Sequence, residues 1–311
     1  MSTRPVENPE LEEELTFRER LLLDIRAASV EFFGTATFLL LGLGGIQAGS
    51  ITDGSTLERT MYFATSFGLS LLVSAWLFYR VTGGLFNPNV SLALCLVRVI
   101  TPMRFVLYCI AQLAGGIAGA ALVRALTPEP YSVNVFLKNH INKAQGVFIE
   151  MFITAALVLA VLMLAAEKHE ATPFAPIGIG LTLFAGHLFA LAYTGAAMNT
   201  ARAFGPAVVS GFPHSDHWVY WLGPFVGSLL GVAVYTFLKH YRYWTINPGQ
   251  TAMNPRHSPA DPVDTLKATL NRSGNGDTRR SGSLTGHRTS ADYRRETNGG
   301  LEKRHLNDTA V

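Results

Sequence analysis

The sequence predicts an all-α membrane protein with six transmembrane helices and two re-entrant half-helices, arranged as two inverted repeats. Three observations support this prediction. The 311 residues are 49% hydrophobic, and the apolar runs gather between about 27 and 240 while both ends are polar. Several runs approach the roughly 20 residues that cross about 30 Å of hydrocarbon. Two shorter apolar stretches and an internal repeat complete the pattern.

The chain starts with a polar segment, residues 1–26, which we expect in the cytoplasm. Its first part is acidic and lacks a short apolar core followed by small residues, so it does not resemble a secretory signal. Six apolar segments of spanning length follow. They run approximately over residues 27–49, 61–81, 103–126, 146–166, 173–194 and 217–238.

Two apolar stretches, 88–98 and 200–211, are too short to span a bilayer. Each follows a glycine-containing turn that ends in an asparagine, Asn87 or Asn199. Asparagine is a good helix N-cap, and Pro88 suits the first position of a helix. We therefore expect two half-helices that begin inside the membrane. Irregular backbone at that depth needs protein or a water-filled cavity around it.

The two halves of the chain repeat each other at an offset of 112 residues. This offset aligns Gly68 with Gly180 and Asn87 with Asn199. We place repeat 1 at about 27–126 and repeat 2 at about 146–240, within one channel-type domain over 27–240. Each repeat holds three spans, an odd number, so the second repeat must enter the membrane from the opposite side. Inverted repeats of this kind bring discontinuous helices together at the midplane.

The last part of the chain, residues 247–311, is rich in Ser, Thr, Asn, Gly, Arg and Asp. Such a composition cannot bury a core, so we expect a disordered cytoplasmic tail. Its basic residues supply much of the formal charge of +3. Nucleic-acid binding is therefore not expected from the charge.

The two turns and the half-helices after them resemble the aquaporin (major intrinsic protein) family, in the style of its fungal orthodox members. The residues that carry the resemblance are Gly83-Gly84-Leu85-Phe86-Asn87-Pro88-Asn89 and Thr194-Gly195-Ala196-Ala197-Met198-Asn199-Thr200-Ala201-Arg202. The resemblance covers about 27–240. It implies a homotetramer with one pore in each subunit.

Both copies depart from the family's Asn-Pro-Ala signature: the chain has Asn87-Pro88-Asn89 and Asn199-Thr200-Ala201. The two asparagines are expected to present amide N–H groups to a passing water. Thr200 restores a backbone N–H that a proline would lack, and its own hydroxyl cannot fully shield that group. Asn89 adds a bulkier polar side chain near the pore waist. We expect these two departures to modify or narrow the centre of the pore.

The resemblance also places the narrow filter of the pore. Phe67 lies twenty residues before Asn87, while His187, Ala196 and Arg202 lie twelve before, three before and three after Asn199. Arg202 would supply donors and a charge that repels cations. Phe67 and His187 would leave a hole about as wide as one water. Family members that pass glycerol usually have a smaller residue in place of His187 and an Asp after the arginine, where this chain has Ala203.

Other intramembrane polar and small residues are expected to serve the structure. Glu31 and Glu150 begin the two repeats and would accept hydrogen bonds from the loops before the half-helices; a proton-relay role is the alternative. Five glycines at four-residue spacing in the third and sixth spans let helices approach closely, and we expect them to pack the two repeats against each other. These glycines are Gly115, Gly119, Gly223, Gly227 and Gly231.

These features together favour a passive water channel in the lipid bilayer that excludes ions and protons, with hydrogen peroxide as a plausible passenger. The alternatives are a wider facilitator for glycerol-type solutes, a secondary transporter, and a largely closed channel-like membrane protein. No catalytic motif, cofactor motif or metal-ligand spacing is present in the sequence, so an enzyme is not expected. An even number of spans places both termini on one side; we expect the cytoplasmic side of the plasma membrane.

Overall fold

A computed structural model describes residues 16–247, 249–250, 263 and 267 of the chain. Six of its helices are long and apolar enough to cross a membrane. They are α2 (Phe17–Ser50), α3 (Thr56–Thr82), α5 (Pro102–Leu126), α6 (Lys143–Val161), α7 (Ala175–Ala190) and α9 (Val219–His240). A π-helical turn, Leu162–Ala166, extends α6, and a 3-10 turn, Thr172–Phe174, precedes α7. The described residues contain no strand. The all-helical fold class is confirmed, while the expected tail lies almost entirely outside the described residues.

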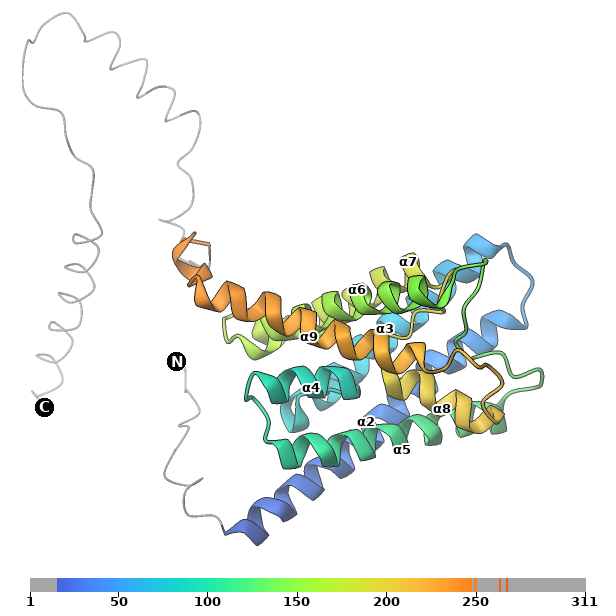
Figure 1. Cartoon of the computed structure of the whole chain (residues 1–311), viewed down its shortest axis with the longest axis horizontal. Helices are drawn as coiled ribbons and strands as arrows, with labels where there is room; N and C mark the ends of the chain where they lie inside the picture. Colours follow the sequence, from blue (N-terminus) through green and yellow to red (C-terminus); the bar gives the residue numbers. More distant parts are fainter. Residues whose placement is uncertain (1–15, 248, 251–262, 264–266, 268–311) are drawn as a thin grey trace, which may run out of the picture. The chain divides into compact units, whose positions relative to one another are not determined.

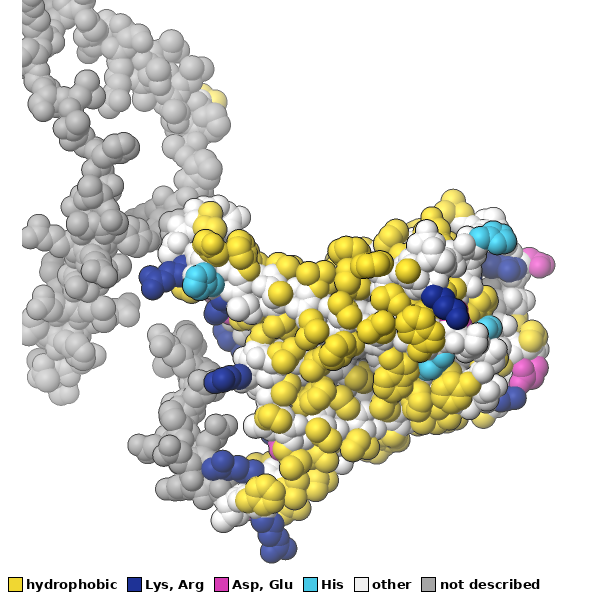
Figure 2. Space-filling model, in the orientation of Figure 1, with side chains coloured by type: hydrophobic (Ala, Val, Ile, Leu, Met, Phe, Trp, Pro, Cys, Tyr) yellow, Lys and Arg dark blue, Asp and Glu magenta, His cyan; other side chains and the backbone are white. Residues whose placement is uncertain are grey.

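The outer surface of the helical body has the character of a lipid-facing protein. Large apolar side chains such as Phe33, Leu77 and Ile110 are exposed on the spans. On the face shown in Figure 2, hydrophobic side chains cover the middle, and charged side chains gather toward the two ends. Such an apolar surface would be a liability in water, and it fits a bilayer.

The first span begins ten residues earlier than its apolar run indicates. Helix α2 starts at Phe17, where the Thr16 side chain accepts from the Glu19 backbone and the Glu19 carboxylate accepts from the Thr16 backbone. This capping box satisfies end groups that the helix itself leaves unpaired. Hydropathy detects only the apolar part of the helix, so it missed the polar start.

Two short helices lie inside the bundle: α4 (Pro88–Leu96) and α8 (Thr200–Ser210). Asn87 caps α4 and Asn199 caps α8, and each asparagine side chain accepts from the first turn of its own helix. Figure 1 shows that the two helices run outward from the middle of the bundle toward opposite ends. Their N-termini therefore meet halfway along the bundle, as two re-entrant half-helices require.

The glycines in the third and sixth spans pack within each repeat, which corrects the expectation that they join the two repeats. A Cβ on Gly115 would lie 2.5 Å from the Phe32 carbonyl oxygen of α2. In the second repeat, a Cβ on Gly227 would lie 2.5 Å from the Met151 carbonyl oxygen of α6. Glycine therefore permits close contact both between α2 and α5 and between α6 and α9. Spacing alone revealed close packing but not the partner helix.

Other glycines form the contact between the repeats. On α3 and α7, Gly68 and Gly180 face each other, and a Cβ on Gly180 would lie 2.7 Å from the Gly68 carbonyl oxygen. Between α5 and α8, a Cβ on Gly205 would lie 2.3 Å from the Gly116 carbonyl oxygen. Only a residue without a side chain permits such an approach. The second contact fixes α8, and with it one wall of the site.

Candidate functional site

Two buried carboxylates hold the loops that lead into the half-helices. In the first repeat, Glu31 accepts from the backbone N–H groups of Leu85 at 3.2 Å and Phe86 at 2.8 Å. The Thr82 hydroxyl donates to the same carboxylate at 2.5 Å, and the Gln112 amide donates at 2.8 Å. Four donors satisfy a carboxylate that is fully buried.

The second repeat contains the same arrangement. Glu150 accepts from the backbone N–H groups of Ala197 and Met198, both at 2.9 Å, and from the Thr194 hydroxyl at 2.6 Å. Each of these three donors lies 112 residues after its counterpart in the first repeat. The carboxylates therefore shape two equivalent loops, and nothing in their contacts resembles an acid and a base arranged for proton transfer.

Both loops end in a residue with left-handed backbone just before the capping asparagine. Phe86 has φ 51° and Met198 has φ 52°. Such a conformation costs on the order of 1–3 kcal/mol for a residue other than glycine. It turns each carbonyl toward the opposite half-helix, where the Asn199 amide donates to the Phe86 carbonyl and the Asn87 amide donates to the Met198 carbonyl, both at 2.8 Å.

These bonds leave one amide hydrogen on each asparagine without an acceptor in the described part of the protein. A side-chain amide has two N–H groups and one oxygen. In Asn87 and Asn199, the oxygen accepts from the half-helix backbone and one N–H donates across the junction. The remaining N–H of each is free to donate to a solute. The junction therefore fixes the orientation of both amides and leaves one N–H of each without a protein acceptor.

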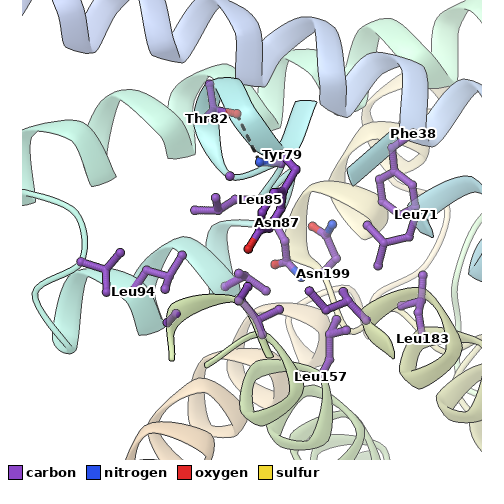
Figure 3. A pocket seen from close by; sticks show the side chains of 18 of the residues that line it. Phe38, Leu71, Tyr79, Thr82, Leu85, Asn87, Leu94, Leu157, Leu183 and Asn199 are labelled. Atoms are coloured by element: carbon purple, nitrogen blue, oxygen red, sulfur yellow. Dashed lines mark hydrogen bonds between the residues drawn. The ribbon is translucent and has the colours of Figure 1, made fainter. Parts of the chain in front are cut away.

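A cavity of about 320 Å³ reaches this junction from the side of the bundle where α6 and α9 end. Figure 3 shows Asn87 and Asn199 side by side in the cavity, with Leu71, Leu157 and Leu183 on its apolar wall. The apolar wall offers water few places to bind, so the amides are the main polar groups that a solute meets at this depth.

Sequence reasoning missed two polar residues that line the same cavity, Tyr79 and Lys168. Within the described part of the chain, the buried Tyr79 hydroxyl has no hydrogen-bond partner. Leu71 and Thr82 line the cavity too, on the same helix as Phe67. Continuing the helical spacing from Phe67 along α3 would have indicated this face.

Asn89 and Thr200 contact each other where the two half-helices meet. The amide oxygen of Asn89 accepts from the Thr200 backbone N–H at 3.0 Å and lies 2.9 Å from the Thr200 hydroxyl. Neither residue is among those that line the cavity. The Asn89 side chain is turned toward the opposite half-helix, and its expected effect on the pore waist stays a prediction.

Three of the four expected filter residues, Phe67, His187 and Arg202, come together beyond the asparagines. The rings of Phe67 and His187 stack with centroids 4.8 Å apart, and the Arg202 guanidinium lies 4.9 Å from the Phe67 centroid. Ala196, the fourth expected residue, is buried in the loop before α8. Phe67, His187 and Ala196 are 0% exposed and Arg202 is 2% exposed. These residues are therefore tightly packed in this structure.

Two polar atoms in the filter have no protein partner in the described structure: His187 Nε2 and Arg202 Nε. The other ring nitrogen of His187 lies 2.9 Å from the Leu183 carbonyl oxygen, and an Arg202 terminal nitrogen donates to the Val133 carbonyl at 3.1 Å. These bonds fix both side chains. An unpaired buried polar group is costly, so the two free atoms are suited to a passing polar solute.

A wider vestibule of about 590 Å³ lies beyond the filter. Ser132 and Asn134, which flank the Arg202 partner Val133, are part of its wall, as are Arg124 and Lys138. Burial and the nearby Arg202 charge lower the pKa of the Lys138 ammonium. The vestibule, filter, amide junction and inner cavity thus follow one another along the bundle.

Within the described residues, no three His, Cys, Asp or Glu side chains are close enough to hold a metal ion. Cys95 and Cys109 are free thiols. The site therefore consists of amides, a guanidinium, an imidazole and apolar walls.

Six membrane-crossing helices around two half-helices that meet at paired amides define a membrane channel. The sequence model of the major intrinsic protein family matches residues 19–235. Two aquaporins of Laccaria bicolor are each 66% identical over 253 residues, covering 79% of this chain and 81% of the relative. Aquaporin-1 of Gibberella zeae is 48% identical, covering 71% of each chain.

The chain belongs to the major intrinsic protein family, the aquaporins. It is a channel for water or another small solute and not an enzyme. The solved structure of the aquaglyceroporin from Plasmodium falciparum has the same fold, with a TM-score of 0.61 over 70% of this chain and 95% of that one. Its sequence identity is 19%, so this likeness concerns the fold alone.

Proposed function

We propose that the protein is a passive water channel that excludes ions and protons. The observation that carries the proposal is the pair of asparagine amides, each with one N–H in reserve, at the end of a mostly apolar cavity. Hydrogen peroxide, a neutral solute of similar size, would follow the same path. The other polar groups near the junction, Glu31 and Glu150, have a structural role, as has Pro88 at the start of α4.

The paired amides act on the orientation of the water. A water between Asn87 and Asn199 accepts from both, so its own hydrogens point away along the pore. This orientation interrupts the chain of hydrogen bonds along which a proton would move. The N-termini of α4 and α8 also meet there, and their positive dipole ends raise the energy of a cation or proton at the junction.

The filter selects by size and charge. Arg202 and His187 offer polar atoms on one side, while Phe67 provides an apolar wall and Ala196 adds little bulk. The stacked Phe67 and His187 rings leave little room beside Arg202, which disfavours a three-carbon polyol. The Arg202 charge, with Lys138 in the vestibule beyond, opposes the entry of cations. These contacts favour water over a glycerol-type solute.

A second candidate is a largely closed channel. One observation favours it: three of the four filter side chains have no surface open to a water-sized sphere. A conducting filter must open wide enough to admit one water molecule. Flux measurements separate the two candidates, because a closed filter gives no water conductance.

We propose that both termini lie in the cytoplasm and that the protein is a homotetramer in the plasma membrane. The side that holds the start of α2 and the end of α9 carries more basic residues near the spans than the opposite side. On the terminal side these are Arg18, Arg20, Arg26, Arg80, Arg98, Arg104, Lys168, Lys239 and Arg242; on the opposite side they are Arg59, Arg124, Lys138 and Lys143. The tetramer and the compartment rest on the family.

Proteoliposomes containing the purified protein test the proposal. An impermeant osmolyte should shrink them much faster than protein-free vesicles, whereas a glycerol gradient should equilibrate no faster than in controls. A pH-sensitive dye inside the vesicles should show no added proton leak. Rapid glycerol entry would favour the wider facilitator, and water flux equal to that of protein-free vesicles would favour the closed channel.

A further inference from the structure

We propose that Asn89 is a positioning residue for the second half-helix, in which its side-chain amide compensates for the absence of a proline at position 200. The two departures from Asn-Pro-Ala are then one coupled feature. As far as flux is concerned, this inference rests on the proposed channel function. It assigns Asn89 a role at the contact between α4 and α8 and not in the pore.

The contact itself is short and buried. Asn89 Oδ1 accepts from the Thr200 backbone N–H at 3.0 Å and lies 2.9 Å from Thr200 Oγ, with 5% of Asn89 and 3% of Thr200 exposed. The Thr200 hydroxyl has one hydrogen, which can go to Asn89 or to the Tyr220 carbonyl at 3.2 Å. Among the described residues, the Thr200 N–H has no other acceptor. Without Asn89 this backbone donor would be buried and unpaired.

The pseudo-symmetry of the two half-helices shows why the donor exists. Pro88 is the first residue of α4 and Thr200 is the first residue of α8. The proline has no N–H, so α4 needs no acceptor at this point. The preceding residues have nearly the same backbone: Asn87 has φ −152° and ψ 115°, and Asn199 has φ −158° and ψ 116°. A proline would therefore fit at position 200, because extended backbone suits the residue before it.

The contact connects the half-helices to the sixth span. Ser228 on α9 lies 2.9 Å from the Asn89 carbonyl oxygen and can donate to it. The Tyr220 carbonyl, also on α9, lies within reach of the Thr200 hydroxyl, and the Tyr220 hydroxyl donates to the Thr194 carbonyl at 2.6 Å. Asn89 thus lies at the centre of a polar brace that joins α4, α8 and α9.

This brace acts on the pore through the first turn of α8. Thr200 lies between Asn199, whose amide faces the cavity, and Arg202, which forms the filter. If the Thr200 N–H loses Asn89, the first turn must move to find another acceptor, or stay unpaired. Either outcome displaces both pore groups or weakens the fold. Losing the hydrogen bond between Asn89 and the Thr200 N–H should therefore change the selectivity of the channel as well as the stability of the protein.

A double-mutant cycle tests the coupling with the variants N89A, T200P and N89A/T200P. N89A leaves the Thr200 donor unpaired, and T200P leaves the Asn89 oxygen without its donors. We expect each single change to lower water permeability by about threefold to tenfold and the unfolding temperature by about 2–6 °C. The double variant removes donor and acceptor together, so it should return to within about twofold of the unchanged protein.

Selectivity separates positioning from plain loss of stability. The single variants should raise glycerol permeability relative to water, and the double variant should restore the ratio. T200S is the matched control, since it keeps both donors and should behave as the unchanged protein. If T200P is not obtained folded, T200V with N89A replaces it: T200V keeps the backbone N–H, so N89A should remain harmful in the T200V background, and a harmless N89A there would overturn the inference.

Two further results would overturn the inference. In the first, the losses in permeability and unfolding temperature of the single variants simply add in the double variant. In the second, the unfolding temperatures are coupled but water flux and selectivity do not change in any variant. The unfolding temperatures measure the coupling without any flux. If the unchanged protein passes no water, the proposed function fails, while the cycle in unfolding temperature still decides whether Asn89 and Thr200 form one unit.

Discussion

Individual side chains at the pore have only part of their hydrogen-bonding capacity used by the protein. Asn87 and Asn199 each keep one amide N–H, and His187 and Arg202 each keep one unpaired buried nitrogen. The remaining contacts of these residues fix their orientation. Fixed donors spaced along an apolar path are what a small polar solute needs in order to move without binding tightly.

The filter assignment predicts that His187→Gly admits larger solutes. Removing the imidazole opens the space beside Phe67 and opposite Arg202. We expect glycerol permeability to rise on the order of tenfold, equal to about 1.4 kcal/mol in barrier height, with water flux retained. Stopped-flow light scattering of proteoliposomes measures both. His214→Gly, which removes a histidine from the vestibule, is the control and should leave selectivity unchanged; unchanged selectivity in His187→Gly refutes the assignment.

We predict that the Tyr79 hydroxyl is a further group that forms a hydrogen bond with water in the inner cavity. Its buried hydroxyl has no partner within the described residues, and its ring lines the cavity. Tyr79→Phe removes that hydroxyl and keeps the ring, so we expect water permeability to fall by about twofold to tenfold, corresponding to about 0.5–1.5 kcal/mol for one hydrogen bond. Equal permeability of the two proteins would show that water does not use this group.

Among the elements, the half-helices depend on close contacts that no side chain can enter. Gly205→Ala would place a Cβ 2.3 Å from the Gly116 carbonyl oxygen, so α8 must move away from α5. We expect a loss of about 1–3 kcal/mol in stability and a clear loss of water flux. Thermal unfolding in detergent and vesicle shrinkage measure the two effects.

Gly44→Ala is the matched control for this change. A Cβ on Gly44 would meet nothing nearer than a Val123 methyl at 4.0 Å. The added methyl therefore fits, and replacing a helical glycine with alanine should leave the protein as stable or more stable. If both alanine variants behave alike, the α5–α8 contact does not fix the site.

The end of α9 is tied to the end of α6 by Glu167. Its carboxylate accepts from Tyr235 and Lys239 at 2.6 Å and from Tyr243 at 3.0 Å. Partial burial alone would raise the pKa of Glu167, but the hydrogen bonds from Lys239, Tyr235 and Tyr243 outweigh it and lower the pKa below the ordinary value of 4.5. The stabilisation is therefore complete above about pH 4.5 and is lost as the pH falls further.

Glu167→Gln should lower the unfolding temperature at neutral pH and remove part of the acid sensitivity. Lys239 is partly exposed, so we expect about 1 kcal/mol, or about 2–4 °C. Thermal unfolding between about pH 3 and about pH 8 measures this, because the range covers both the full stabilisation above about pH 4.5 and its loss below that pH. Glu170→Gln, at an exposed position nearby, is the control. Identical pH profiles for Glu167→Gln and the unchanged protein would contradict the role of this carboxylate.

For the whole molecule, the sequence was sufficient to predict the spans, the half-helices and the inverted repeats. These features depend on the length of apolar runs, on local caps at Asn87 and Asn199, and on one offset of 112 residues. The structure adds a test of that offset: Glu31 and Glu150 bind equivalent donors in the two loops. The family assignment followed from the same residues.

Contacts between distant segments were beyond sequence reasoning. The spacing of Gly115 and Gly227 indicated close packing, but only the three-dimensional register shows that their partners lie in the same repeat. Asn89 and Thr200 lie far apart in the chain, so each looked like a separate departure until the structure placed them in contact. Local patterns predict elements, whereas the pairing of polar groups across the junction requires their positions.

The central claim is that water crosses the bundle in single file past the Asn87 and Asn199 amides. A crystal structure at a resolution that resolves ordered water tests it most directly. We predict a file of waters from the inner cavity to the filter, with one water oxygen within hydrogen-bond distance of both Nδ2 atoms. A junction where the amides are far apart or turned to lipid, with no water between them, would contradict the account.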